Sequence, residues 1–187
     1  TTPEQPGGGE TPDTPDTPDT PVVLTPAEIV NAAYGLAAGA TLENGPYTLT
    51  GIITAVTEPY NSEFGNVTVN IVVEALGNKV IQLRRMSVSG DVLAAGDTVT
   101  VTGDLQNYNG TVQMYKPTLD SYKKASEIID ILYALENRAE TTEKYALTGV
   151  ITSIASAWSD QFSNISVDMQ IAGDTRTVQA FRIKGKD

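Results

Sequence analysis

The stretch that decides the fold is YTLTGIIT, residues 47–54, because it returns 98 residues later as YALTGVIT, residues 145–152. In both stretches small residues alternate with larger apolar ones, and a period of two predicts a β-strand with one buried face. Gly51, within the first run, predicts a bulge or a tight bend.

The repetition continues on both sides of these strands. Glu28-Ile29 returns as Glu127-Ile128, Tyr34 as Tyr133, residues 64–69 as 162–167, and Arg85-Met86 as Arg182-Ile183. A period this long exceeds a solenoid repeat and predicts the duplication of a whole domain. The second copy stops at Asp187, before any counterpart of residues 98–115. We therefore expect either that residues outside this chain complete it or that the chain is a fragment.

The first copy reads as a short helix followed by five strands. Thr25-Pro26-Ala27-Glu28 offers an N-cap, a first-turn proline and a capping-box glutamate. The expected helix carries Ile29, Ala33, Leu36 and Ala37 as an apolar stripe and ends near Gly39. The expected strands cover residues 47–56, 66–74, 79–86, 98–105 and 111–115, with an Asn-Gly hairpin turn at residues 109–110. Five strands in this length predict a small closed barrel.

The first 21 residues differ in character, because they repeat Thr-Pro-Asp and contain no side chain that could begin a core. We predict a disordered linker over 1–24, one module over 25–120 and a partial module over 121–187, made of a helix and three strands. The fold class predicted is mainly β: a five-stranded barrel with a short N-terminal helix, duplicated, with the second copy truncated.

Composition narrows the possible functions. The chain contains neither histidine nor cysteine, which removes the commonest general base, thiol nucleophiles, disulfides and nearly every zinc site. We expect no enzyme activity, cofactor or metal. A net charge of -11 disfavours binding to phosphate backbones. No apolar run is long enough to span a bilayer, so membrane insertion is not expected.

Four motifs of the chain resemble those of a known family. YTLTGIIT, FGNVTVNIVVE at 64–74, AAGDTVTVTGDLQNYNG at 94–110 and the AEIV helix at 27–30 are similar to tandem OB-fold modules of secreted and cell-surface Gram-positive proteins. Such modules accompany extracellular nucleases and polysaccharide-degrading enzymes, so the resemblance implies an extracellular accessory module without catalytic residues. Two departures are the short stretch 87–96 in place of an inter-strand helix and the helix that precedes the barrel.

An OB barrel binds ligands on its second and third strands and the flanking loops. The candidate ligand-binding residues in these places are Tyr60, Asn61, Arg85, Tyr108, Asn109 and, at the position of Tyr60 in the second copy, Trp158. Rings and amides suit a sugar or a base. The alternative is that the rings pack over the barrel mouth and that Arg85 is an ordinary solvated charge. Phe64 and Phe162 are expected in the core.

Three functions stay open on the sequence alone. The favoured one is a module that binds a polysaccharide or cell-surface glycan. The others are a nucleic-acid-binding module of a secreted nuclease and a spacer between other domains of the same polypeptide.

Overall fold

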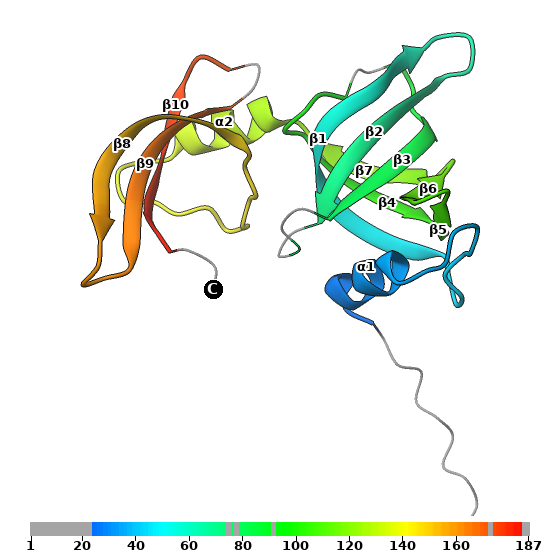
Figure 1. The fold of residues 1–187 in the computed structure, drawn as a ribbon. Helices are drawn as coiled ribbons and strands as arrows, with labels where there is room; N and C mark the ends of the chain where they lie inside the picture. The colour runs from blue at the N-terminus through cyan, green and yellow to red at the C-terminus, as the bar shows by residue number, and fades with distance from the viewer. Residues whose placement is uncertain (1–23, 74–75, 77–78, 91–92, 172–173, 185–187) are drawn as a thin grey trace, which may run out of the picture.

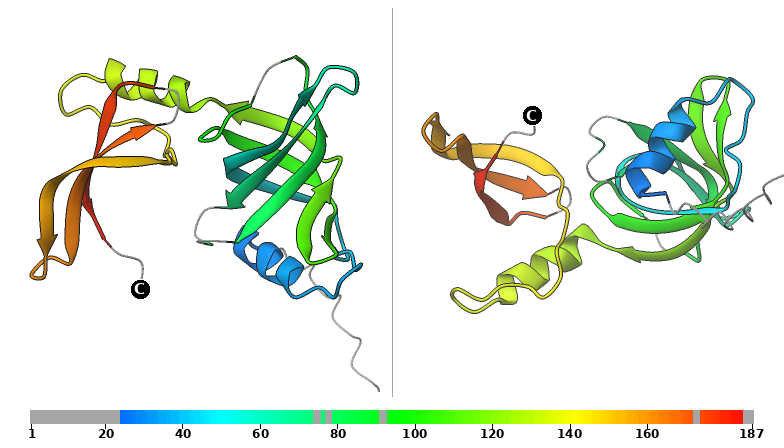
Figure 2. Two further views of the ribbon diagram at one scale, coloured as in Figure 1. Left: turned by 45° about the horizontal axis from the view of Figure 1, so that its top comes forward. Right: turned by 90° about the horizontal axis from the view of Figure 1, so that it is seen from below.

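The computed structural model describes residues 24–184, except 74–75, 77–78, 91–92 and 172–173. The predicted linker therefore lies outside the described residues, apart from Leu24. The described part is mainly β and contains a larger sheet with helix α1 (Pro26–Tyr34) and a smaller sheet with helix α2 (Ala125–Ala134) (Figure 1). Figure 2 shows the two sheets side by side, with α2 leading from one to the other.

Helix α1 begins as the sequence predicts. The Thr25 hydroxyl accepts a hydrogen bond from the backbone N–H of Glu28, and the Glu28 carboxylate accepts one from the N–H of Thr25, which completes a capping box. The helix ends at Tyr34 and is capped by Gly35, so the predicted end at Gly39 is wrong. Glycine is a poor helix former, and Leu36 and Ala37 already lie beyond the last turn.

The larger sheet has seven strands instead of the five predicted. They are β1 (Tyr47–Asn61), β2 (Asn66–Val73), β3 (Val80–Ser87), β4 (Thr98–Gly103), β5 (Leu105–Tyr108), β6 (Thr111–Tyr115) and β7 (Thr118–Lys123). The expected strand 98–105 is interrupted at Asp104, which separates β4 from β5. A Cβ on the neighbouring Gly103 would lie 3.2 Å from the Cβ of Pro117. Strand β7 was not predicted.

The strand order in the larger sheet is β5-β6-β3-β2-β1-β4-β7. All neighbours are antiparallel except β3 and β6, which are parallel. This order is that of a mixed sheet with two ends, so the pairing does not describe the closed five-stranded barrel expected from the sequence. One continuous core fills its concave side, and Ile53, Ile71, Ile81, Leu83 and Met114 are fully buried there.

Two local predictions in the larger sheet have clear outcomes. The Asn109-Gly110 turn joins β5 to β6 with φ angles of 49° and 90°, the two positive values that a type I′ hairpin needs. Gly51 is not a bulge, since the register is regular there. A Cβ at Gly51 would lie 2.9 Å from the carbonyl oxygen of Val72, so close approach of the neighbouring strand requires glycine.

The smaller sheet contains β8 (Gly149–Ser159), β9 (Asn164–Ile171) and β10 (Thr177–Ile183) in the order β10-β9-β8. Its β8–β9 pairing repeats β1–β2 at a constant offset: Gly149 faces Ile171 as Gly51 faces Val73, and Ile154 faces Val167 as Val56 faces Val69. All three register shifts recur as well. The strand expected from Tyr145 begins only at Gly149. The equivalent residues 47–50 are in a strand because they pair with β4. No described strand lies beside residues 145–148.

No helix in the described ranges is both long enough and apolar enough to cross a membrane.

Candidate functional site

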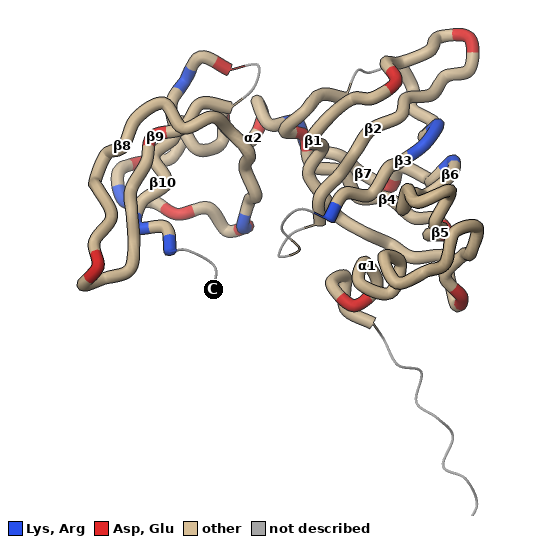
Figure 3. The backbone as a smooth tube through the Cα atoms, in the orientation of Figure 1, with Lys and Arg blue, Asp and Glu red and all other residues tan. Residues whose placement is uncertain are grey.

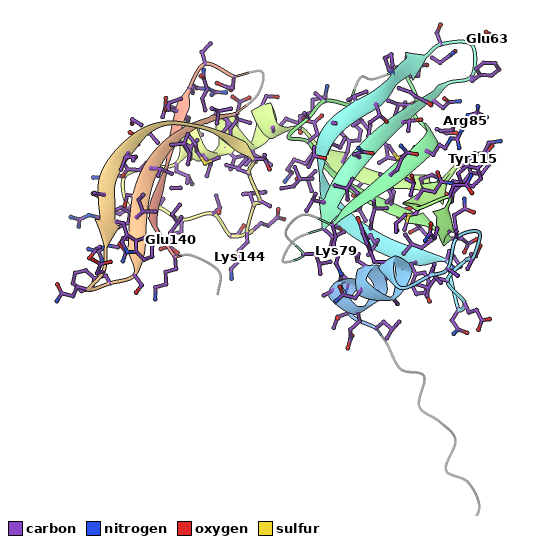
Figure 4. All side chains as sticks on the ribbon, in the orientation of Figure 1. Glu63, Lys79, Arg85, Tyr115, Glu140 and Lys144 are labelled. Carbon is purple, nitrogen blue, oxygen red and sulfur yellow. The ribbon has the colours of Figure 1, made fainter. Side chains whose placement is uncertain are left out.

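A hollow with polar and aromatic walls lies at one end of β1, β2 and β3. It has a volume of about 670 Å³ and is lined by Glu58, Pro59, Tyr60, Asn61, Phe64, Asn66, Arg85 and Lys116. The β1–β2 hairpin supplies most of this wall, β3 supplies Arg85, and the residue after β6 supplies Lys116. In Figure 4, Glu63 marks the tip of the hairpin, and Arg85 lies next to Tyr115.

Backbone geometry brings Arg85 to this surface. Between the pairs Val67–Met86 and Val69–Leu83 the register shifts, so that one residue of β2, Thr68, lies opposite two of β3. Arg85 has a φ of 53°, and its N–H donates to the Thr68 hydroxyl at 3.1 Å. That hydroxyl in turn donates to the Glu58 carboxylate at 2.7 Å. The bulge therefore connects β1, β2 and β3 directly under the hollow.

The hollow is locally basic although the whole chain is acidic. The Arg85 guanidinium beside the Tyr115 phenol, followed by the charge of Lys116, lowers the pKa of Tyr115 below its usual value of 10. The Lys116 ammonium lies 5.3 Å from the centre of the Tyr115 ring. Figure 3 shows these basic segments on β3 and at the end of β6. Two cations beside one carboxylate favour a polar or anionic ligand group here.

The structure brings together three of the six predicted site residues. Tyr60, Asn61 and Arg85 line the same hollow. The Asn61 side-chain oxygen accepts hydrogen bonds from the backbone N–H groups of Glu63 and Phe64, so this amide also shapes the hairpin.

The other three predicted residues lie elsewhere. Tyr108 and Asn109 lie at the β5–β6 turn and do not line the hollow. The Arg84 guanidinium lies 5.8 Å from the centre of the Tyr108 ring. Trp158 belongs to β8 in the smaller sheet, is 50% exposed, and donates its ring N–H to Asp160. One sequence-based site therefore separates into a hollow, a hairpin turn and a strand of the smaller sheet.

The prediction that Phe64 and Phe162 pack in the core is wrong. They are 67% and 61% exposed, because each lies in the turn before its strand and not within it. Sequence reasoning also missed Lys116 and Tyr115, which reach the site through the parallel pairing of β6 with β3. The signal in the sequence is the Lys116-Pro117 pair, which marks the end of a strand beside the site.

No cluster of acidic residues in the described ranges is arranged to hold a metal ion. The sequence matches no family model, and no curated protein or solved structure shows significant similarity to it. The function must therefore be inferred from this chain alone.

Proposed function

We propose that the larger sheet is a non-catalytic binding module of a secreted or cell-surface protein and that it binds a polysaccharide or cell-surface glycan in the hollow of Tyr60, Asn61 and Arg85. The observation that carries the proposal is the exposed ring of Phe64 beside Tyr60, amides and two cations in one concave surface. An exposed ring of this size has no role in packing the core. It offers flat apolar area to a sugar ring, while the amides and cations offer directional hydrogen bonds to hydroxyl or carboxylate groups.

We also propose that the larger sheet is OB-like and that the smaller sheet is a second, partial copy. Strand β4 pairs with β1, and β5 pairs with β6. A single residue, Asp104, separates β4 from β5 in the chain. The paired strands run in the order β1-β2-β3-β6-β5, with β6 parallel to β3. Since β5 follows directly from β4, which pairs with β1, this order leads back to β1, as it does in an OB barrel. The shared register of β1–β2 and β8–β9 supports the duplication.

A second candidate function is binding of single-stranded nucleic acid, which Arg85, Lys116 and the neighbouring rings favour locally. Bases stack on aromatic side chains, and cations contact phosphates. The chain's charge of -11 opposes this function through long-range repulsion. The third alternative, a spacer, would leave the hollow without a ligand.

Affinity electrophoresis through gels containing a panel of neutral and acidic glycans tests the first proposal. We expect at least one glycan to retard the chain, and Tyr60→Ala or Phe64→Ala to weaken binding by about tenfold, the typical contribution of one stacked ring. The matched controls are Trp158→Ala and Phe162→Ala, the equivalent loop positions of the smaller sheet, which should leave retardation unchanged. Absence of retardation on every glycan contradicts the proposal, and salt-sensitive binding to single-stranded DNA replaces it with the second candidate.

The geometry of the site is testable without a ligand. Since the Arg85 guanidinium lies beside the Tyr115 phenol and lowers its pKa, Arg85→Gln should raise the pKa of Tyr115 toward 10, as measured by NMR of its ring carbons. Arg84→Gln is the control, because Arg84 faces the Tyr108 ring. An unchanged titration of Tyr115 in Arg85→Gln would show that the two side chains are not in contact.

A further inference from the structure

We infer that the smaller sheet is a docking site for a polypeptide segment whose first and last strands would pair with the free sides of β8 and β10 at once. This is separate from the hollow, so success or failure here leaves the proposed ligand site untouched.

The inference begins from the neighbours of each strand. In the larger sheet β1 lies between β2 and β4, and β3 lies between β2 and β6. The corresponding strands β8 and β10 each pair with β9 only, and no other described strand contacts their outer sides. Unpaired N–H and C=O groups along a strand are a ready template for another strand.

The apolar side chains of the smaller sheet give the second observation. Ile53 and Met86 are fully buried, whereas their counterparts Ile151 and Ile183 are 59% and 41% exposed. Helix α2 and β9 do have a small core, formed by Ala125, Ile129 and Ile171. The exposed residues therefore belong to one flank of an otherwise packed unit, and an apolar flank of this kind typically marks an interaction surface.

In the larger sheet, the strands that correspond to β8 and β10 are each paired on their outer side by a further strand. Strand β4 pairs antiparallel with β1, with Val99 opposite Gly51 and Val101 opposite Leu49. Strand β6 pairs parallel with β3, with Met114 opposite Leu83. Residues 96–116 supply both strands in one continuous segment, with alternating threonine and valine in β4, the short strand β5 between them, and an Asn-Gly turn before β6.

The occupant that we infer has the same chemistry: an uncharged strand with alternating threonine and valine, a connection that holds a short strand and an Asn-Gly turn as β5 and residues 109–110 do, and a final apolar strand. Its first strand would lie antiparallel to β8, opposite Leu147 and Gly149, and its final strand parallel to β10, opposite Gln179 and Ala180. The N–H of Ile151 would donate to an incoming carbonyl, as the N–H of Ile53 donates to Asp97 at 2.8 Å. A second copy pairing through β8 alone would leave the β10 side uncovered, which makes it the poorer fit.

The test adds a synthetic peptide of residues 96–116 to the whole chain and follows backbone amides by hydrogen exchange and NMR. We expect saturable binding, with at least tenfold slower exchange at residues 149–151 and 179–181 and no change at 51–53, which β4 already covers. A peptide of the same composition in scrambled order is the control for non-specific association.

A pair of chain variants sharpens the assignment. Ile151→Lys places a charge at the position equivalent to the buried Ile53 and should weaken peptide binding at least tenfold. Val150→Lys, one residue away and also exposed, points to the opposite face of β8 and should bind normally. Both positions are exposed, so neither variant is expected to unfold the sheet.

Several results would overturn the inference. The first is that about 1 mM peptide gives no saturable protection, because a dissociation constant above this concentration would be too weak for a specific contact. Protection of the β8 side in the chain alone, rising with protein concentration, would assign the surface to a second copy instead. Equal loss of binding in Val150→Lys and Ile151→Lys would show that the peptide does not follow the register of β4.

Discussion

The two sheets of this protein share the register of their first hairpin, but they differ in how far the first strand of that hairpin is paired and buried. In the larger sheet β1 is an interior strand, and Leu49 and Ile53 are buried. In the smaller sheet β8 is an edge, and every residue from Gly149 to Trp158 is exposed. The hairpin pairing therefore forms from local sequence, whereas burial depends on strands that come later in the chain.

A buried acid, Asp97, links the two sheets. Asp97 is 4% exposed, and its carboxylate accepts hydrogen bonds from the N–H of Ala94 and from the N–H of Ala125 at the start of α2. Gly96, beside it, leaves room for Ala125. An acid at the first turn of a helix is favoured by the helix dipole, so Asp97 fastens the second helix to the loop before β4.

The largest expected difference between the sheets concerns matched isoleucines. Ile53→Ala removes a fully buried side chain from a packed core and should lower the free energy of unfolding by about 2 to 5 kcal/mol. Ile151→Ala removes an exposed one and should cost less than about 0.5 kcal/mol. Urea denaturation followed by NMR signals of each sheet measures both. Equal losses would mean that the flank of β8 is covered in solution.

Matched glycines give the next largest effect. A Cβ at Gly51 would lie 2.9 Å from the Val72 oxygen, and one at Gly149 would lie 2.6 Å from the Gln170 oxygen. We expect Gly51→Ala to cost about 1 to 3 kcal/mol, because β1 is held on both sides and cannot shift. Gly149→Ala should cost less despite the closer approach, since β8 is free to move outward. Thermal unfolding of the two variants decides the order, and the reverse order would show that β8 is as constrained as β1.

The smallest effect concerns pH and the attachment of each helix. The Tyr34 hydroxyl donates to the Val80 carbonyl beside Lys79, and the Tyr133 hydroxyl donates to the Thr177 carbonyl beside Arg176. The second attachment also involves a close ion pair, from Arg176 to Asp174 at 2.5 Å and to Asp130 at 2.7 Å.

The hydrogen bonds from Arg176 lower the pKa of Asp174 from 3.8 to about 2. A carboxylate with a depressed pKa stabilises the folded form above about pH 4, and this contribution is lost as the pH falls from 4 toward 2. We expect the smaller sheet to lose stability over that range, and the Asp174→Asn variant to lack this dependence. NMR titration of the carboxyl carbon measures the midpoint. A midpoint near 3.8 would show that the ion pair is absent in solution.

The candidate site shows why sequence reasoning locates some functional residues and misses others. Tyr60 and Asn61 are neighbours in one hairpin, so their proximity is local and predictable. Arg85 joins them through a bulge that no sequence pattern announces, and Lys116 through a parallel pairing between distant strands. Tyr108 and Trp158 are, like Tyr60, aromatic residues at predicted loop positions. Strand pairing nevertheless places them in other parts of the molecule.

The sequence by itself determined the hairpins, the first helix cap, the Asn-Gly turn and the repeat, because each depends on contacts between residues close in the chain or on a pattern of period two. Only the tertiary structure decided which apolar residues are buried, where the expected strand 98–105 divides into β4 and β5, and which side chains share the hollow. Those outcomes depend on pairings between strands far apart in the chain. The smaller sheet shows the consequence: the same local pattern without such partners leaves its apolar flank exposed to solvent.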